Sequence, residues 1–250
     1  MSEGQARIRL YVTAGLAAGA VVGLSPEQAH YLKSVMRAAP GTPLLLFNGS
    51  EGEWRARLEA MGKGWASCAV EAMTRPQADE ADLWLVFAPI KRARIDFVAQ
   101  KATELGVSAL WPIMTRHTAV ARVNTERLRA NAIEAAEQCG RLTVPRVLAP
   151  VALDALLADW PAGRRILLCD EEGGGVAIGR ALRGIAAEAS PWAVMVGPEG
   201  GFAPDELDRL RKLPIVTAVG LGPRVLRADT AALAALACWQ AIAGDWRGRS

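Results

Sequence analysis

The chain has 250 residues, a net charge of +3, four cysteines and two histidines. Its 51% hydrophobic and 22% charged residues are typical of a globular protein, and this length gives one large or two modest domains that need no disulfide or metal to fold. The cysteines form no CxxC pair and the histidines no HExxH motif, so we expect a reducing compartment and no metal centre.

The N-terminus and the charge distribution restrict the location and the partners. The opening MSEGQARIRLYV has no apolar core of signal-peptide length, and no run approaches the roughly 18 apolar residues of a membrane span, so we expect a cytoplasmic protein without membrane contact. Residues 84–150 carry ten lysines and arginines against five acids. This excess suits a surface that binds a polyanion, although arginine-rich helices that only face solvent would give the same count.

Residues 1–75 predict a small β-barrel-like domain. One helix is expected to begin at Ser25-Pro26-Glu27-Gln28, with serine as N-cap, proline at the first helical position and glutamine at the capping-box position, and to end at Pro40-Gly41. Asn48-Gly49 predicts a hairpin turn. Strands are expected over residues 8–13, 44–47, 54–58 and 65–73. Residues 75–82, with Pro76 and three acids, are expected to form the linker.

Residues 76–250 predict an α/β domain with a parallel sheet covered by helices, because strand and helix patterns alternate from residue 83 onwards. Strands are expected over residues 83–89, 107–113, 165–169, 192–196 and 215–219. Helices are expected over residues 95–105, 128–136, 204–213 and 229–242, the last of them capped by Asp229.

A glycine-rich loop at residues 196–202 follows a buried strand and precedes a helix. Three glycines around Glu199 let backbone amides approach a ligand without obstruction by a Cβ atom, and open α/β sheets bind ligands at such strand ends. A tight structural turn is the alternative interpretation. Neither a GxGxxG fingerprint nor a Walker A motif is present, so a dinucleotide or a nucleoside triphosphate is not indicated.

A second loop at residues 220–231 holds two arginines before an apolar helix that opens at Asp229-Thr230. Arg227 beside a helix N-terminus would favour an anionic or polar ligand, whereas the alternative leaves Asp229 as a plain N-cap and the arginines in solvent.

Two further segments carry charged residues on or beside helices. Arg141 follows a helix that Gly140 could simply terminate. Arg94, Lys101 and Glu104 share another helix, where Lys101 and Glu104 could form an ordinary surface pair.

Five segments together resemble the RsmE family of 16S rRNA uridine-N3 methyltransferases in the SPOUT superfamily. They cover essentially the whole chain and occur in the same order as in the family. The segments are residues 30–41 (His30-Tyr31-Leu32, Val35-Met36-Arg37 and Gly41), 100–107 (QKATELGV), 134–141, 197–202 and 221–231. Where the family usually has Glu-Thr-Ala, this chain has Asp229-Thr230-Ala231, so the acid is one methylene shorter.

The resemblance implies an N-terminal PUA-like β-barrel that helps to hold RNA and a C-terminal α/β domain with a deep trefoil knot. It also implies a homodimer that uses S-adenosyl-L-methionine and acts on 16S rRNA or the small ribosomal subunit. The residues expected to bind this cofactor are Leu168, Cys169, Glu171, Gly197, Pro198, Glu199, Gly200, Gly201, Leu221, Gly222 and Leu226. The residues expected to bind RNA are Arg9, Arg37, Lys91, Arg94, Lys101 and Arg141.

Methylation at uridine N3 requires removal of the N3 proton, because the protonated nitrogen is a poor nucleophile. A general base, or a cation that stabilises the anion across O2 and O4, would supply this activation. Arg227 is our candidate for the cation and Glu199 or Asp229 for the base, although Glu199 could instead bind the cofactor. Two other hypotheses are a nucleotide-dependent oxidoreductase, which the missing fingerprint disfavours, and a non-catalytic RNA-binding module whose glycine loops are structural.

Overall fold

A computed structural model describes residues 8–78, 80–185 and 191–248. The chain divides into two compact units, the first formed by Met1–Asp79 with Ala136–Val144 and the second by Glu80–Ala135 with Pro145–Ser250. Among the helices in the described residues, none is long and apolar enough to cross a membrane.

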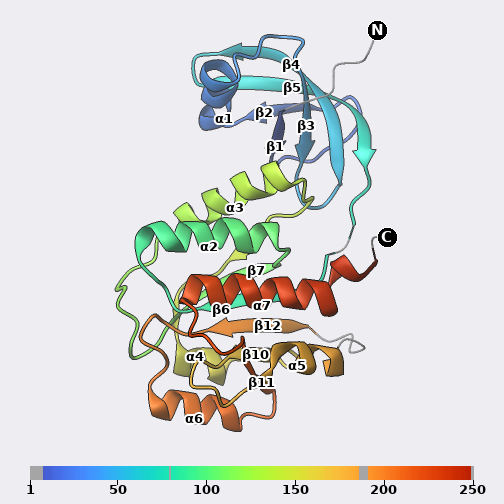
Figure 1. Cartoon of the computed structure of the whole chain (residues 1–250). Helices are drawn as coiled ribbons and strands as arrows, with labels where there is room; N and C mark the ends of the chain where they lie inside the picture. The colour runs from blue at the N-terminus through green and yellow to red at the C-terminus, as the bar shows by residue number, and fades with distance from the viewer. Residues whose placement is uncertain (1–7, 79, 186–190, 249–250) are drawn as a thin grey trace. The chain divides into compact units, whose positions relative to one another are not determined.

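The first unit is built on a five-stranded sheet with the order β1-β3-β4-β5-β2 (Figure 1). Its strands are β1 (Arg9–Tyr11), β2 (Val21–Leu24), β3 (Pro43–Phe47), β4 (Glu53–Gly62) and β5 (Trp65–Arg75). β1 runs parallel to β3 and the other neighbours are antiparallel. Asn48-Gly49 lies in a loop longer than the predicted hairpin turn, since β4 begins only at Glu53, and Asn48 Oδ1 closes this loop by accepting from the Ser50 and Glu51 amides at 3.0 Å.

The helix of the first unit begins as predicted and ends in an unpredicted conformation. α1 (Pro26–His30) starts with the complete Ser25–Gln28 capping box. It continues as a π-helical segment, η1 (Tyr31–Val35), in which the Met36 amide donates to the Tyr31 carbonyl at 3.0 Å. Arg37 ends the segment in the left-handed region, at φ 51°.

A buried ion pair fastens the segment Ala136–Val144 into the first unit. Arg9 Nε lies 2.6 Å from Glu53 Oε2, and the Glu53 side chain is only 7% exposed. Burial by itself raises the pKa of Glu53, but the hydrogen bonds from Arg9, Thr74 and Arg75 outweigh it and lower the pKa. Arg9 also donates to the Ala136 carbonyl at 2.6 Å. Residues of β1 and β4, which are distant in the sequence, therefore hold the segment Ala136–Val144 in place.

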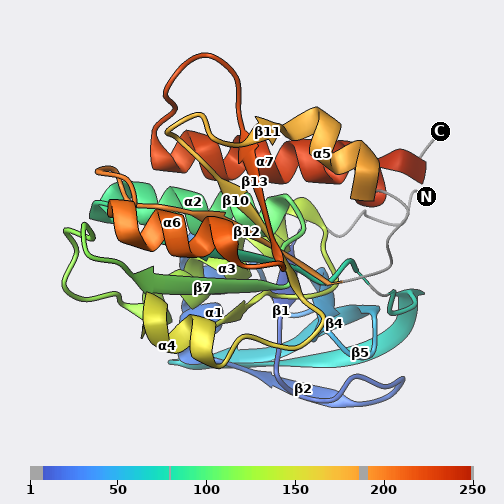
Figure 2. The same cartoon turned by 90° about the horizontal axis from the view of Figure 1, so that it is seen from below.

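The second unit is an α/β domain around a sheet of parallel strands, as predicted. The strand order is β11-β13-β10-β12-β6-β7-β8, with β9 paired to β7 (Figures 1 and 2). Its strands are β6 (Leu83–Phe87), β7 (Ala109–Met114), β8 (Arg146–Val147), β9 (Val151–Ala152), β10 (Arg165–Cys169), β11 (Val176–Ala177), β12 (Trp192–Val196) and β13 (Val216–Gly220). Its helical elements are α2 (Arg92–Glu104), α3 (Thr125–Cys139), α4 (Leu153–Ala158), α5 (Ile178–Ile185), α6 (Pro204–Lys212), α7 (Ala228–Ile242) and η2 (Asp245–Gly248). The last four residues of α3 belong to the first unit.

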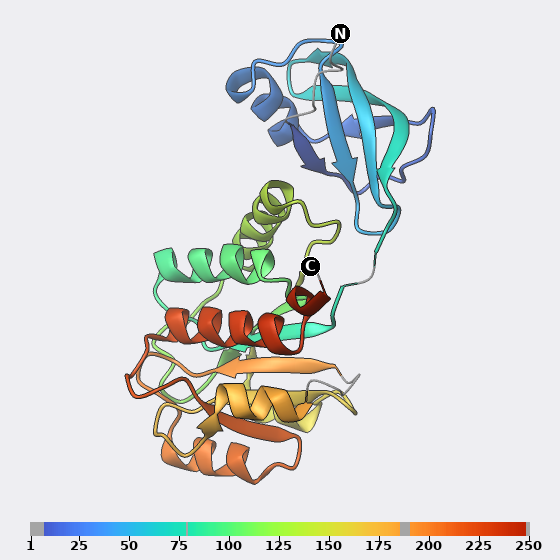
Figure 3. The same ribbon diagram turned by 45° about the vertical axis from the view of Figure 1, so that its right-hand side comes forward.

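Helices cover both faces of this sheet, which gives the second unit two hydrophobic cores (Figure 3). In β6, Leu83 and Leu85 belong to the core shared with α2, α5 and α7, whereas Trp84 and Val86 belong to the core shared with α4 and α6. This alternation follows from the two-residue period of a strand. Burial on both faces explains why these strands read as continuous apolar runs.

The connection between β10 and β11 passes across β13, which lies between these two strands in the sheet. Gly173 adopts φ +81° in this connection. A Cβ atom on Gly175 would lie 2.6 Å from the backbone nitrogen of Val219 in β13. Gly175 is therefore required by the close approach of two backbones, and Gly173 by its left-handed conformation.

The structure corrects one predicted cap. α7 begins at Ala228 with Arg227 at the N-cap position, so Asp229 lies inside the first turn. Its Oδ1 accepts from the neighbouring Thr230 amide at 2.9 Å instead of capping the helix. The short strands β2, β8, β9 and β11 were not predicted, because segments of two to four residues show little periodicity, and the helices α4 and α5 were not predicted either.

Candidate functional site

A cleft of about 750 Å³ opens at the carboxyl ends of β10, β12 and β13 in the second unit. Three loops line most of it, contributed by residues 169–173, 196–201 and 219–228. This is the edge of an open parallel sheet where ligands bind, and the volume lies within the range of small-molecule sites, about 300–1,000 Å³.

Glycines allow the first two loops to approach each other. Glu171 Oε1 accepts a hydrogen bond from the Phe202 amide at 3.2 Å, which joins the loop after β10 to the loop after β12. Gly201 adopts φ +73°, and a Cβ atom there would lie 2.4 Å from Glu171 Oε1. A Cβ atom on Gly197 would lie 2.9 Å from the Phe202 ring. Side chains at these two positions would therefore close or distort the cleft wall.

A buried carboxylate fixes the loop after β10 on its other side. The Asp170 side chain is fully buried and accepts from Arg211 Nε at 2.9 Å and from Arg211 Nη2 at 2.8 Å. The hydrogen bond to Asp170 raises the pKa of Arg211, which remains charged. Glu172 Oε2 lies 3.4 Å from the same guanidinium. Asp170 thus anchors the loop to α6.

A single arginine joins the glycine-rich loop to the start of α7. Arg94 Nη1, in the first turn of α2, lies 2.9 Å from Glu199 Oε1. Arg94 Nε lies 3.8 Å from Asp229 Oδ2. The fold therefore brings together both carboxylates predicted as bases and an arginine predicted to contact RNA.

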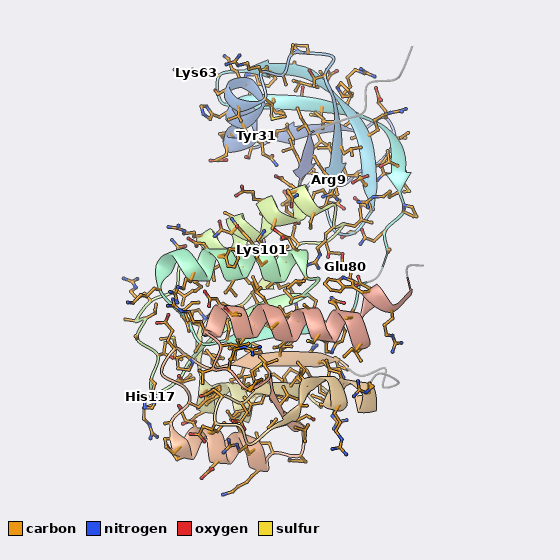
Figure 4. All side chains as sticks on the ribbon, viewed as in Figure 1. Arg9, Tyr31, Lys63, Glu80, Lys101 and His117 are labelled. Carbon is orange, nitrogen blue, oxygen red and sulfur yellow. The ribbon has the colours of Figure 1, made fainter. Side chains whose placement is uncertain are left out.

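The segment after β7 packs against the outer side of the glycine-rich loop. Arg116 makes two hydrogen bonds of 2.7 Å to the Asp205 carboxylate at the start of α6, and its amide donates to Glu206 Oε1 at 2.9 Å. His117 Nδ1 lies 3.2 Å from the Gly201 carbonyl oxygen (Figure 4). The sequence did not indicate this support, because these residues lie far from the loop along the chain and match no motif.

The chemical character of the cleft is mixed. Leu221, Val225 and Leu226 supply apolar surface, and Glu171 and Glu172 add negative charge. Further cations line the cleft, and among the residues that the structure describes they make no hydrogen bond or ion pair through their side chains. These cations are Lys91, Arg224 and Arg227.

Most of the residues expected to bind the cofactor line this cleft. They are Cys169, Glu171, Gly197, Pro198, Glu199, Gly201, Leu221, Gly222 and Leu226, and Arg227 lies beside them. Leu168 is instead buried in the core around α4 and α6, and Gly200 lies against the outer support, where an added Cβ would be 3.7 Å from His117 Cβ. Burial raises the pKa of the Cys169 thiol to about 12, so this thiol is a neutral part of the wall.

Several cleft residues were not singled out as cofactor-binding residues, although most of them lie in the loops predicted to bind a ligand. Only Glu172, Gly173 and Val219 lie outside those loops. The others are Asp170, Val196, Gly220, Pro223, Arg224, Val225, Ala228 and Ala231. The Gly173–Gly175 run was the available signal for the loop after β10, since consecutive glycines mark a close backbone approach. Metal-ligating side chains do not gather in groups of three or more anywhere in the described part of the chain.

The residues predicted to bind RNA lie in different environments, and the prediction for them stays untested. Lys91 and Arg94 line the cleft. Lys101 lies on α2, where it pairs with Glu104 at 2.6 Å and its Nζ is 6.0 Å from the Phe97 ring centroid (Figure 4).

The other three belong to the first unit. Arg37 is exposed, and Arg141 donates to Thr143 Oγ1 at 3.0 Å. Arg9 is held by Glu53 and stacks 3.7 Å from the Phe47 ring centroid.

Family models match both parts of the chain. A model described as an RNA methyltransferase domain matches residues 77–240, and one described as an RNA methyltransferase PUA domain matches residues 24–75. Among similar proteins, the ribosomal RNA small subunit methyltransferase E of Rickettsia conorii is 32% identical, with 92% of this chain and 93% of that protein covered. The protein of the same name from Bacillus subtilis is 30% identical over 85% of this chain and 87% of its own.

Solved structures agree with these matches. A ribosomal RNA small subunit methyltransferase E from Neisseria gonorrhoeae, bound to S-adenosyl methionine, superposes with a TM-score of 0.86 at 30% identity and covers 96% of this chain and 99% of that one. A putative methyltransferase from Legionella pneumophila, in complex with the same cofactor, superposes with a TM-score of 0.82 at 29% identity and covers 95% and 98%.

Proposed function

This chain belongs to the ribosomal RNA small subunit methyltransferase E family, and we propose that it transfers a methyl group from S-adenosyl-L-methionine to N3 of a uridine in 16S ribosomal RNA. The observation that carries the proposal is the cleft at the carboxyl ends of β10, β12 and β13, whose three loops approach one another through glycines. Two similar proteins were solved with the same methyl donor.

The residues of the cleft fit this donor. Leu221, Val225 and Leu226 offer apolar surface to an adenine ring, and backbone groups around Gly197 and Gly201 are accessible because no Cβ covers them. The negative charges of Glu171, Glu172 and Glu199 match a ligand that carries a sulfonium and an ammonium group. When bound, the donor supplies an electrophilic methyl group.

The chain itself must activate the uridine and orient it. Arg227, exposed at the cleft rim, would stabilise the anion that remains when the N3 proton leaves. Glu199 or Asp229 would accept that proton. Orientation contributes further, because a nucleophile held in line with the methyl group reacts without the entropic cost of an encounter.

The proposal includes RNA contacts in both units. The first unit, matched by the PUA family model, would hold RNA together with the basic 84–150 region, with Arg9, Arg37, Lys91, Lys101 and Arg141 as the proposed contacts. Such binding should weaken steeply with salt, because phosphate contacts release counterions.

We further propose a cytoplasmic homodimer with a trefoil knot. Support for the knot comes from β13, which lies between β10 and β11 while the connection that joins those two strands crosses it. The tight contact of Gly175 with Val219 is consistent with a chain threaded through a closed loop. The dimer is proposed from the family resemblance, and the location from the proposed ribosomal substrate.

Two measurements test the function. Calorimetry with S-adenosyl-L-methionine should show binding, and incubation with the donor should methylate small-subunit rRNA and leave large-subunit rRNA unmodified. If the purified protein neither binds the donor nor modifies the RNA, the glycine loops are structural and the proposal fails.

The variant Arg227→Ala separates catalysis from binding. We expect a loss on the order of 10²-fold in kcat, a typical size for removing one electrostatic contact made in the transition state, with donor affinity retained within a few-fold. If donor binding and thermal stability fall together instead, Arg227 braces the loop and has no catalytic role.

A further inference from the structure

We infer that Arg94 is a positioning residue that acts through Glu199 and Asp229, joining the glycine-rich loop to the first turn of α7. The reaction it serves rests on the proposed function. The coupling itself is a property of the donor-free protein and can be tested without any ligand.

The geometry of the three side chains supports this role. Arg94 Nη1 lies 2.9 Å from Glu199 Oε1, and Arg94 Nε lies 3.8 Å from Asp229 Oδ2. Arg94 is therefore committed to two carboxylates, and a phosphate at the same place would have to compete with both of them. These contacts indicate a role in the cleft in place of the RNA contact expected from the sequence.

The two carboxylates belong to segments that are far apart in the chain, and of the two only Glu199 lines the cleft. Glu199 lies in the loop between β12 and α6, whereas Asp229 lies in α7. Both are paired with the same cation, so removing Arg94 would leave two like charges without their shared partner. Asp229 is only 18% exposed, which weakens the screening of its charge by solvent.

Partial burial also distinguishes this bridge from an ordinary surface pair. Arg94, Glu199 and Asp229 are 34%, 44% and 18% exposed, whereas Arg116 and Asp205 in the neighbouring support are 60% and 63% exposed. Fully exposed pairs contribute little to stability. Arg94, which pairs with two partly buried carboxylates, should therefore stabilise the glycine-rich loop more than the exposed Arg116–Asp205 pair does.

Backbone amide exchange in the donor-free protein tests the bridge directly. In Arg94→Ala, the amides of residues 200–202 should exchange about 5-fold faster than in the parent, which corresponds to the upper range measured for a single ion pair. Arg94→Lys should recover part of this protection, because one ammonium can still approach one carboxylate. In a Glu199→Gln background, Arg94→Ala should have a smaller effect, since the two residues share one interaction.

Arg127→Ala is the matched control. Arg127 lies on α3 and makes two hydrogen bonds to Asp96, which is on α2 like Arg94. Arg127 does not line the cleft. Its loss should leave the exchange of residues 200–202 unchanged. Equal exchange in the two alanine variants, or an Arg94→Ala effect that is undiminished in the Glu199→Gln background, would overturn the inference.

Binding measurements then distinguish the positioning role from an RNA contact. Arg94→Ala should weaken donor affinity by about 5-fold, by the same reasoning, while the salt dependence of RNA binding keeps its slope. A slope reduced by about 1 would identify Arg94 as a phosphate contact and overturn the inference. If the parent fails to bind the donor but Arg94→Ala accelerates exchange, the proposed function fails and the positioning role stands.

Discussion

Replacing Gly201 by alanine should damage the cleft through two separate effects. The left-handed backbone at φ +73° disfavours a residue with a Cβ, at a cost of about 1–2 kcal/mol. The new Cβ would also lie 2.4 Å from Glu171 Oε1 and displace the carboxylate that accepts from the Phe202 amide. Losing a hydrogen bond to a charged group costs about 1.5–3 kcal/mol.

Together these effects predict a loss of roughly 3–5 kcal/mol in the unfolding free energy of the second unit, or a Tm lower by on the order of 10 °C. Donor affinity should fall as well, because Gly201 lines the cleft. Thermal unfolding and calorimetry on the same samples measure both quantities. In a Glu171→Ala background, Gly201→Ala should cost only the backbone part.

Gly200→Ala is the matched control, since its Cβ would make an ordinary contact of 3.7 Å with His117 and the residue does not need a left-handed backbone. It should unfold within about 1 °C to 2 °C of the parent, as most substitutions without a defined structural cost do. An unchanged Tm in Gly201→Ala, or equal damage from Gly200→Ala, would refute the reasoning.

Three further predictions concern other parts of the chain. Glu53→Gln should destabilise the first unit by about 3–5 kcal/mol in urea unfolding at pH 7, because it leaves a buried arginine without its partner. The pKa of Glu53 is lower in the folded protein, so its contribution to stability is present above the unfolded value near 4.5 and is lost as the pH falls through the folded pKa. The variant should therefore lose less stability than the parent between pH 5 and pH 3. An identical pH profile in the two proteins would contradict this prediction. Gly175→Ala should fold poorly or unfold at a clearly lower temperature, since its Cβ would lie 2.6 Å from the Val219 backbone, and a normal Tm would show that the two segments separate easily. Iodoacetamide at pH 7.5 should modify the exposed Cys139 before Cys169, because burial raises the pKa of the Cys169 thiol to about 12. Peptide mass spectrometry measures the order of modification. Modification of Cys169 first would show that the cleft wall opens freely.

Local patterns predicted the elements that are long or fully buried. β10 and β12 have the predicted bounds, because a run of apolar residues between polar turns identifies a strand buried on both faces. The first-unit helix was correctly placed at its start by the Ser25 capping box, but its π-helical end depends on the Arg37 backbone and on packing that no local pattern encodes. Which strand lies between β10 and β11 is decided by pairing between distant segments. The periodicity of the sequence therefore could not predict that the chain crosses β13 at Gly175.

The glycine-rich loop and the 220–231 loop were predicted as binding segments, and both line the cleft. The loop after β10 was expected there through the family resemblance alone. Side-chain pairing was less predictable: the helical face of α2 suggested a basic surface, yet Arg94 turns to Glu199, 105 positions away in the sequence. Similarly, Asp229 was expected to cap α7, but the N-cap is Arg227, two residues earlier, and the Asp229 carboxylate lies beside Arg94.

Mapping of methylated nucleotides in 16S rRNA tests the central claim most directly. Total rRNA from a strain that lacks this chain would be compared with rRNA from its parent and from a strain complemented with the Arg227→Ala variant. The account predicts one N3-methyluridine in 16S rRNA of the parent, its absence from the deletion strain, and no more than partial recovery with the variant. Identical modification in the deletion strain and its parent, or a lost methyl group on another base or on large-subunit rRNA, would contradict it.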